Sequence, residues 1–144
     1  MWRAFLETHS TVTKYLVWRM SEQHSLYLPW QDVLRQLSDG EDGRLRMGEL
    51  AESVLLTRSG VTQLLDRMIT AGLVVREACR GDRIGYCAVV TQLGLETIEK
   101  VGPDHSKDVW EFFWHVTQEE AAVMEKVFSR VLAADKNLSR DNQD

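Results

Sequence analysis

The sequence has only two cysteines and two prolines among 144 residues, and it has no long apolar run. Two cysteines cannot build a disulfide scaffold, and no cysteine–histidine cluster has the spacing of structural zinc. No stretch approaches the roughly 18 apolar residues that span a bilayer. Charges such as Arg3, Glu7 and Lys14 interrupt the first residues, unlike a signal peptide. These absences predict a single cytoplasmic domain.

Motifs of common enzymes are also missing. The chain has no glycine-rich phosphate loop, no HExxH and no GxSxG sequence. Two groups contain residue types that bind metals: Glu111 with His115, and His105 with Asp104 and Asp108. Either His–carboxylate pair could ligate a metal in principle, but no further ligand follows at a recognisable spacing. We therefore expect no catalytic site, no metal and no cofactor.

Charged residues are present in an ordinary proportion but are unevenly distributed along the chain. The net charge of -5 argues against a nucleic-acid partner, yet seven arginines and no lysine lie between Arg44 and Arg83, against five acidic residues. This centre therefore carries +2 and the remainder -7. Arginine binds phosphate and guanine in a bidentate way that lysine cannot. Solvated ion pairs use the same residues, so charge alone leaves both interpretations open.

The spacing of apolar residues predicts a mainly helical protein. Repeats at three and four residues predict a long helix over about 2–23, a short helix around 30–37 and two short helices over 47–54 and 58–71. Two β-compatible runs, 74–79 and 86–90, enclose a polar tip and predict a hairpin. A helix over about 91–116, kinked at Gly102-Pro103, precedes a last helix with a capping box at Thr117.

The order helix, turn, helix, hairpin is typical of a winged helix-turn-helix. In that motif the start of the second helix meets base edges in the major groove, and the hairpin is a wing. Arg58 suits guanine and Gln63 suits adenine, while an arginine at the tip suits a narrow minor groove and Asp82 would orient it. The predicted DNA contacts are Arg44, Arg46, Thr57, Arg58, Ser59, Gly60, Thr62, Gln63, Arg67, Arg80 and Arg83.

Several short sequences within residues 45–94 carry a family resemblance. They are Glu-Leu-Ala, Thr-Arg-Ser-Gly-Val-Thr, Asp-Arg-Met…Ala-Gly-Leu-Val, and Asp-Arg-x-Gly leading to Thr91-x-x-Gly94. At this spacing the chain resembles the multiple-antibiotic-resistance regulator (MarR) family of winged-helix transcription factors. Leu55 departs from the pattern, because many such turns carry glycine there. The resemblance implies an obligate homodimer, a pseudo-palindromic operator, usually repression, and release by a small, often aromatic, ligand or an oxidant.

The resemblance extends over nearly the whole chain as one domain. It implies dimerisation and pocket helices over 1–40, a DNA-binding lobe over 41–92, dimerisation helices over 93–134 and a flexible tail over 135–144. The aromatic residues near both ends agree with a dimer, since a small monomer cannot bury so much apolar surface. The predicted interface residues are Trp2, Phe5, Trp110, Phe113, Trp114 and Phe128.

An effector pocket between the first two helices and the fifth is one interpretation of the aromatic residues there. Ligand pockets combine aromatic walls with a few polar groups. Plain core or dimer packing is the alternative. The candidate pocket residues are His9, Tyr15, Trp18 and Trp30.

Two other interpretations stay open. Cys79 and Cys87 flank the wing tip, so their oxidation could distort the wing and make the chain a redox-sensing regulator. Oxidant-sensing relatives carry their cysteine in the first helix, however, and strand cysteines are often simply buried. A winged helix that binds a protein instead of DNA is the other alternative, and the outward Arg58, Gln63 and Arg67 argue against it.

Overall fold

A computed structural model describes the backbone of residues 1–54, 58–79 and 85–141, with the side chains of residues 1–54, 59–79 and 85–134. The chain divides into two compact units, Met1–Val109 and Trp110–Asp144. In the described residues, no helix combines the length and apolar character that crossing a membrane requires.

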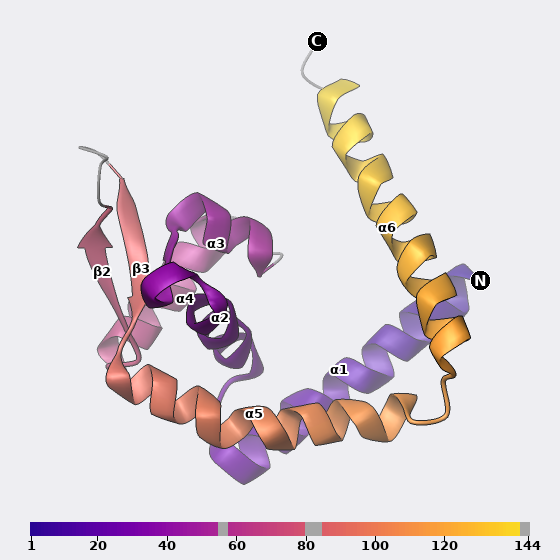
Figure 1. The fold of residues 1–144 in the computed structure, drawn as a ribbon, viewed down its shortest axis with the longest axis horizontal. Coiled ribbons are helices and arrows are strands. Elements are labelled where there is room, and N and C mark those ends of the chain that lie inside the picture. Colours follow the sequence, from indigo (N-terminus) through magenta and orange to yellow (C-terminus); the bar gives the residue numbers. More distant parts are fainter. Residues whose placement is uncertain (55–57, 80–84, 142–144) are drawn as a thin grey trace. The chain divides into compact units, whose positions relative to one another are not determined.

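Helices make up most of both units (Figure 1). The first unit holds α1 (Trp2–His24), α2 (Leu28–Asp39), the 3-10 turn η1 (Glu41–Gly43), β1 (Arg44–Arg46), α3 (Met47–Ser53), α4 (Arg58–Thr70), β2 (Val74–Ala78), β3 (Tyr86–Val90) and most of α5 (Gln92–Phe113). The second unit holds the end of α5 and α6 (Gln118–Asp141). The predicted helices and hairpin are confirmed, with bounds that differ by a few residues. Two differences are that α6 continues to Asp141 and that β1 was not expected.

The sheet has three antiparallel strands in the order β1-β3-β2. In the hairpin Val74 pairs with Val90 and Ala78 with Tyr86, and the register is unbroken between them. On the other edge Arg46 pairs with Cys87. A three-residue Arg-Leu-Arg strand has too little alternation to be recognised from its sequence. Its pairing with β3 is a tertiary effect.

The core of the first unit lies where α2, α3 and α4 meet the sheet. Leu34, Leu37, Leu50, Val61 and Met68 are fully buried there. They recur at the predicted three- and four-residue spacing, so each helix turns one apolar face inward. This packing leaves the opposite face of α4 to the solvent.

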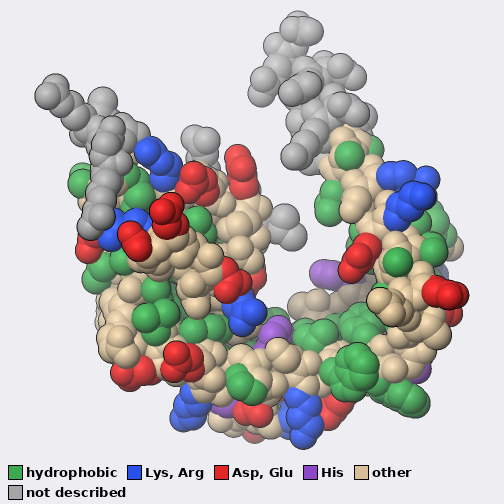
Figure 2. Space-filling model, viewed as in Figure 1, with side chains coloured by type: hydrophobic (Ala, Val, Ile, Leu, Met, Phe, Trp, Pro, Cys, Tyr) green, Lys and Arg blue, Asp and Glu red, His purple; other side chains and the backbone are tan. Residues whose placement is uncertain are grey.

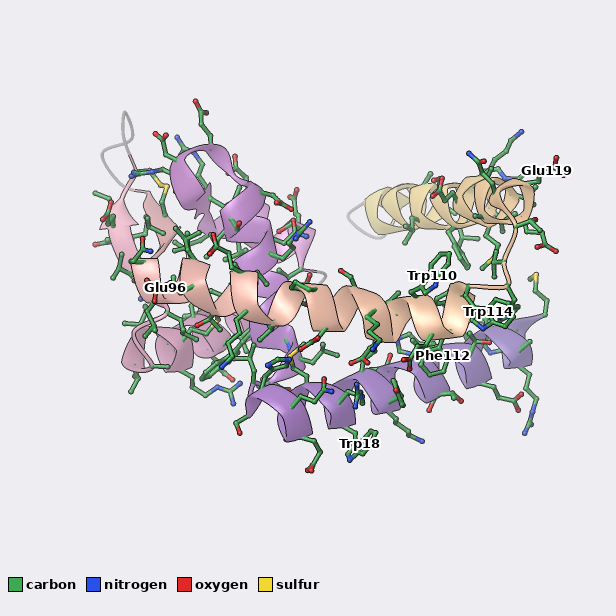
Figure 3. All side chains as sticks on the ribbon, turned by 60° about the horizontal axis from the view of Figure 1, so that its bottom comes forward. Trp18, Glu96, Trp110, Phe112, Trp114 and Glu119 are labelled. Atoms are coloured by element: carbon green, nitrogen blue, oxygen red, sulfur yellow. A yellow bond between two sulfur atoms is a disulfide. The ribbon has the colours of Figure 1, made fainter. Side chains whose placement is uncertain are left out.

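The long helices α1 and α5 run side by side (Figures 1 and 3). Arg19 in α1 donates from its Nε to Asp108 Oδ1 in α5 at 3.0 Å, and Asp108 is almost fully buried. A second contact joins His24 Nε2 to Asp104 Oδ2 at 3.0 Å. α5 continues as one helix through Pro103. Polar bridges therefore fix which turns of α1 and α5 face each other.

Side-chain caps begin α5 and α6. The Thr91 hydroxyl donates to the Gly72 carbonyl at 2.7 Å and accepts from the Gly94 N–H at 3.0 Å. The capping box predicted at the start of α6 is confirmed, because Thr117 and Glu120 each accept from the other's backbone N–H. Such caps satisfy backbone donors that the first helical turn leaves unpaired.

Candidate nucleic-acid interface

The recognition-helix candidate is α4, which starts at Arg58. One face of it is buried in the core, whereas Ser59, Thr62 and Gln63 are exposed and Gly60 is half-buried. These polar residues cluster in the first two turns, where a docked helix would present them to base edges. Thr57 and the side chain of Arg58 lie outside the described residues. The structure therefore places Ser59, Gly60, Thr62 and Gln63 together in the first two turns of α4, and their contact with DNA stays a prediction.

Arg67 has a different environment at the opposite end of α4. Its guanidinium lies 5.7 Å from the centre of the Tyr27 ring, at the start of α2. Five residues separate it from Thr62, which places it about 7.5 Å farther along the helix axis. The cation–π contact joins α4 to α2. A DNA contact by Arg67 remains a prediction that would compete with this packing.

The arginines of β1 also differ from each other. Arg44 is half-buried and lies 3.7 Å from Glu77 Oε2 in β2. Arg46 is exposed, and its backbone N–H donates to Glu49 Oε2 at 3.0 Å, at the start of α3. Of the two predicted phosphate contacts, Arg46 is therefore better placed to reach a ligand from solvent.

The β2–β3 hairpin has the position of a wing beside α3 and α4 (Figure 1). The tip residues Arg80, Asp82 and Arg83 lie outside the described residues. At the base of the tip, Cys79 and Cys87 are buried, and a disulfide joins them. Burial is one of the expected outcomes for these cysteines, whereas the sequence did not predict the bond between them; the open alternative was only that their oxidation could distort the wing.

A cavity of about 480 Å³ lies between α1, α2, the end of α3 and α5. Of the candidate pocket residues, His9 lies in its wall, and a role in ligand binding stays a prediction. Trp18 is 54% exposed and projects from α1 on the side away from α5 (Figure 3), Tyr15 lies beside Trp18, and Trp30 packs against the core. The lining residues are His9, Thr13, Leu28, Pro29, Gln31, Asp32, Val54 and His105.

Burial shifts the pKa values of two ionisable side chains in the wall of this cavity, Asp32 and His105. It raises the pKa of Asp32 above its usual value, although a hydrogen bond with Gln36 and the charge of His105 act in the opposite direction. Burial likewise lowers the pKa of His105, against the carboxylates of Asp108 and Asp32. Within the described part of the chain, the buried Nδ1 of His105 has no hydrogen-bond partner. The cavity therefore favours neutral forms and offers an unused polar atom.

Among the described residues, no three His, Cys, Asp or Glu side chains gather closely enough to hold a metal ion. The arrangement instead combines an exposed polar helix face, a hairpin beside it and a separate small cavity.

Known proteins share this arrangement. A MarR family model matches residues 26–83. AbsC, a MarR family transcriptional regulator from Streptomyces coelicolor, is 31% identical and superposes with a TM-score of 0.89, over 94% of this chain and 92% of that one. The chain belongs to the MarR family. The winged-helix fold predicted from the sequence is thereby confirmed.

Two further transcriptional regulators are similar to this chain. Sco3205, a MarR family transcriptional regulator from Streptomyces coelicolor crystallised in complex with DNA, is 27% identical, with a TM-score of 0.85 over 92% of this chain and 82% of that one. MhqR, an HTH-type transcriptional regulator of Bacillus subtilis, is 24% identical over 83 residues, which are 58% of this chain and 57% of MhqR. The match thus spans less than two thirds of that curated relative.

Sequence reasoning missed most of the cavity of this MarR-family chain. Gln31 and Asp32 follow Pro29 at the start of α2, and His105 lies a third of a turn beyond Asp104 in α5. These three polar residues meet in the cavity because α1, α2 and α5 all contribute to its wall. The one sequence signal that could have indicated these cavity residues was a polar side chain at the edge of the apolar face of a helix.

Replacing His105 with glutamine is expected to reduce the loss of stability on acidification. Because burial lowers the pKa of His105 in the folded state, the unfolded chain binds the proton more readily as pH falls through about 6.5. Wild type should therefore lose stability relative to His105→Gln as the pH falls through about 6.5 and below, until the folded protein also binds the proton. Urea unfolding of both proteins at several pH values measures the difference.

The matched control is His115→Gln, which removes an exposed histidine. It measures how the loss of a histidine that is not buried changes the pH dependence of stability. A stability difference between wild type and His105→Gln that stays constant with pH would contradict the prediction.

Proposed function

We propose that this chain is a homodimeric repressor that binds a pseudo-palindromic operator through α4 and the wing. The observation that carries the proposal is the exposed cluster Ser59, Thr62 and Gln63 at the start of α4, beside a hairpin with an arginine-containing tip. Its similarity to Sco3205, which was crystallised with DNA, supports the same use of the fold. A two-fold dimer would present two recognition helices to two half-sites.

Each element has a distinct role in this proposal. Arg58 and Gln63 contact base edges, and Ser59 and Thr62 bind phosphate. Arg83 or Arg80 enters the minor groove, with Asp82 orienting the arginine. Arg46 holds a phosphate from the edge of β1. The rest of the chain is acidic and repels DNA, so DNA approaches the chain at this basic centre.

Exposed apolar surface supports the homodimer. Trp2 and Phe5 near one end of the chain, and Trp110 and Trp114 near the end of α5, are exposed. On α6 hydrophobic side chains lie at the surface among charged ones (Figure 2), and Val131 and Leu132 are each 63% exposed. A lone helix does not keep such residues in water without a partner surface. A second copy of the chain is the partner that the family implies.

The cavity beside α2 is the proposed effector site. Its volume of about 480 Å³ falls within the range of small-molecule sites. Its wall includes Val54, the C-cap of α3, so a ligand there would touch the end of the helix that precedes α4 in the chain. A small aromatic ligand with a group that hydrogen-bonds His105 Nδ1 would fit. A ligand that favours one arrangement of α3 would shift the DNA-binding equilibrium.

Fluorescence anisotropy tests the proposed function directly. The protein is titrated into labelled DNA from upstream of its own coding region, with random duplex as competitor, at several salt concentrations. Binding that survives the competitor and weakens with salt would support the proposal. Failure to bind any duplex at low salt would overturn it in favour of a protein-binding winged helix.

Replacing Gln63 with alanine is expected to cost about 1–3 kcal/mol of operator binding, because one bidentate base contact is lost. Affinity for random duplex should change little, since phosphate contacts remain. Competition anisotropy on both DNAs measures the two effects. Gln118→Ala, which truncates an exposed glutamine on α6, is the control. An equal loss on random DNA would make Gln63 a phosphate contact instead.

A further inference from the structure

The cavity beside α2 has one carboxylate, and neither lysine nor arginine, among its described lining residues. The carboxylate belongs to Asp32, which is half-buried near the start of α2. Burial removes part of the hydration of the charged form, and this raises the pKa of Asp32. A cation supplied from outside the chain would offset that loss of hydration.

The arginine closest to Asp32 in the sequence is already paired with another residue. Arg35 lines a second cavity of about 410 Å³, which shares Gln31, Asp32 and His105 with the first. The side chain of Arg35 is 59% exposed, and its Nε donates to Asp39 Oδ2 at 3.1 Å. The positive charge of Arg35 is therefore held beside Asp39 at the surface, where water screens it.

His105 does not supply a balancing charge either. Burial lowers its pKa, although Asp108 and Asp32 act in the opposite direction, so the neutral imidazole is favoured. Its buried Nδ1 has no hydrogen-bond partner within the part of the chain that the structure describes. In a neutral imidazole the nitrogen without a hydrogen accepts a hydrogen bond. The two cavities thus share a carboxylate and an imidazole that can both accept from a ligand.

Part of the wall of the cavity beside α2 is apolar and suits a ring. Leu28, Pro29 and Val54 contribute to it. Removing apolar surface from water stabilises a complex by about 25 cal/mol per Å². Small-molecule sites combine such walls with a few polar groups that fix the orientation of the ligand.

From this arrangement we infer that the cavity beside α2 selects a protonated aromatic amine over an aromatic carboxylate. The inference rests on the proposed function and names the ligand class of its effector site. The ammonium of the ligand donates to an Asp32 carboxylate oxygen and to His105 Nδ1, and the ring packs on the apolar part of the wall. Hydrogen bonds between ionised partners are about twice as strong as those between neutral ones.

Asp32 discriminates by repulsion as well as by attraction. A ligand carboxylate at the same place would bring two negative charges together in a partly desolvated site. It would also donate no hydrogen bond, so Asp32 and His105 Nδ1 would stay unpaired. Asp32 is therefore the residue that determines the charge of the ligand.

Isothermal titration calorimetry of the full chain without DNA tests the inference with three probes. Tyramine, tyrosol and 4-hydroxyphenylacetate share a phenol ring, and the end of their side chain is positive, neutral and negative, respectively. At pH 8 an ordinary histidine is neutral, whereas a primary amine keeps its proton. We expect tyramine to bind at least about tenfold more tightly than tyrosol, and 4-hydroxyphenylacetate to bind most weakly.

The variant Asp32→Asn keeps the shape of the side chain and removes its charge. Its affinity for tyramine should fall about tenfold, whereas its affinity for tyrosol should stay within about twofold of wild type. The matched control is Asp39→Asn, which removes an exposed carboxylate from the same helix, outside the described lining of the cavity. This control should leave the order of the three probes unchanged. Circular dichroism checks that both variants keep the helix content of wild type.

Several results would overturn the inference. In wild type they are equal binding of tyramine and tyrosol, tighter binding of 4-hydroxyphenylacetate, and no binding of any probe at millimolar concentration. A preference for tyramine that survives Asp32→Asn would overturn it as well, because the amine would then bind elsewhere.

Fluorescence anisotropy with labelled duplex separates the inference from the proposed function. If tyramine binds as expected but the chain binds no duplex, the proposed function fails and the ligand class stands. If the chain binds duplex and tyramine leaves that affinity unchanged, the cavity has no regulatory role, although its preference for an amine remains.

Discussion

Gly94→Ala is expected to lower the free energy of unfolding by about 3 kcal/mol, which is about 10 °C in melting temperature. A methyl group on Gly94 would collide with the Leu73 carbonyl oxygen and would lie 2.7 Å from Val90 Cγ2. The carbonyl belongs to the backbone just before β2, so it cannot turn away as a side chain could. Gly94 also donates to the cap residue Thr91, so the start of α5 must move as a whole.

The same substitution elsewhere in α5 provides the control. A methyl group on Gly102 would meet no atom within 4 Å, so Gly102→Ala should change stability by less than about 1 kcal/mol. Urea unfolding followed by circular dichroism measures both variants. If Gly94→Ala and Gly102→Ala lose the same stability, the close approach of Gly94 to the Leu73 carbonyl does not limit the size of the side chain at that position.

Periodicity explains which parts of the fold could be predicted from the sequence. Val61, Leu64, Leu65 and Met68 define one face of α4, and the same pattern exposes Gln63 on the other face. The exposed start of the recognition helix therefore follows from local information. The capping box at Thr117 is also local, since its partner lies three residues away.

The cavity beside α2, which we propose as the effector site, could not be predicted in the same way. Aromatic spacing selects Trp18 and Trp30 as candidates, but it does not say which face of α1 meets α5. The Arg19–Asp108 contact holds that face, and it joins residues 89 positions apart in the sequence. Asp32 in α2 and His105 in α5 are also far apart in the sequence and line one cavity only in the folded chain, so no local pattern could bring them into one site.

The wing cysteines illustrate a third situation. Their positions on either side of the tip follow from the sequence, and the alternatives of separate burial or oxidation both fit. The register of β2 and β3 decides between them, because it places Cys79 opposite Gly85 and leaves Cys87 two residues farther along the same face. A hairpin with one fewer residue in its tip would put the two side chains on opposite faces.

Phe128→Glu/Leu132→Glu is expected to convert the proposed dimer to monomer and to weaken operator binding more than about 100-fold. The two residues lie one turn apart on the exposed apolar side of α6. In a two-fold dimer each substitution occurs twice, so four large apolar contacts of about 1.5–3 kcal/mol are lost. That total, about 6–12 kcal/mol, is comparable to the whole binding energy of a micromolar to nanomolar dimer. Sedimentation equilibrium measures the mass, and anisotropy measures the DNA affinity.

Ala122→Glu/Ala133→Glu is the matched control, because it adds the same charge to α6 on the other side of the helix. Both alanines are exposed, and at 100° per residue they lie about 80° or more away from Phe128 and Leu132 around the helix axis. This variant should keep the dimer mass and most of the operator affinity. If both variants lose the dimer equally, added charge alone is responsible and the apolar stripe is not the interface. If the Phe128→Glu/Leu132→Glu protein stays dimeric, then α6 does not contribute to the contact, and the apolar surface of α1 and the end of α5 must hold the two copies together.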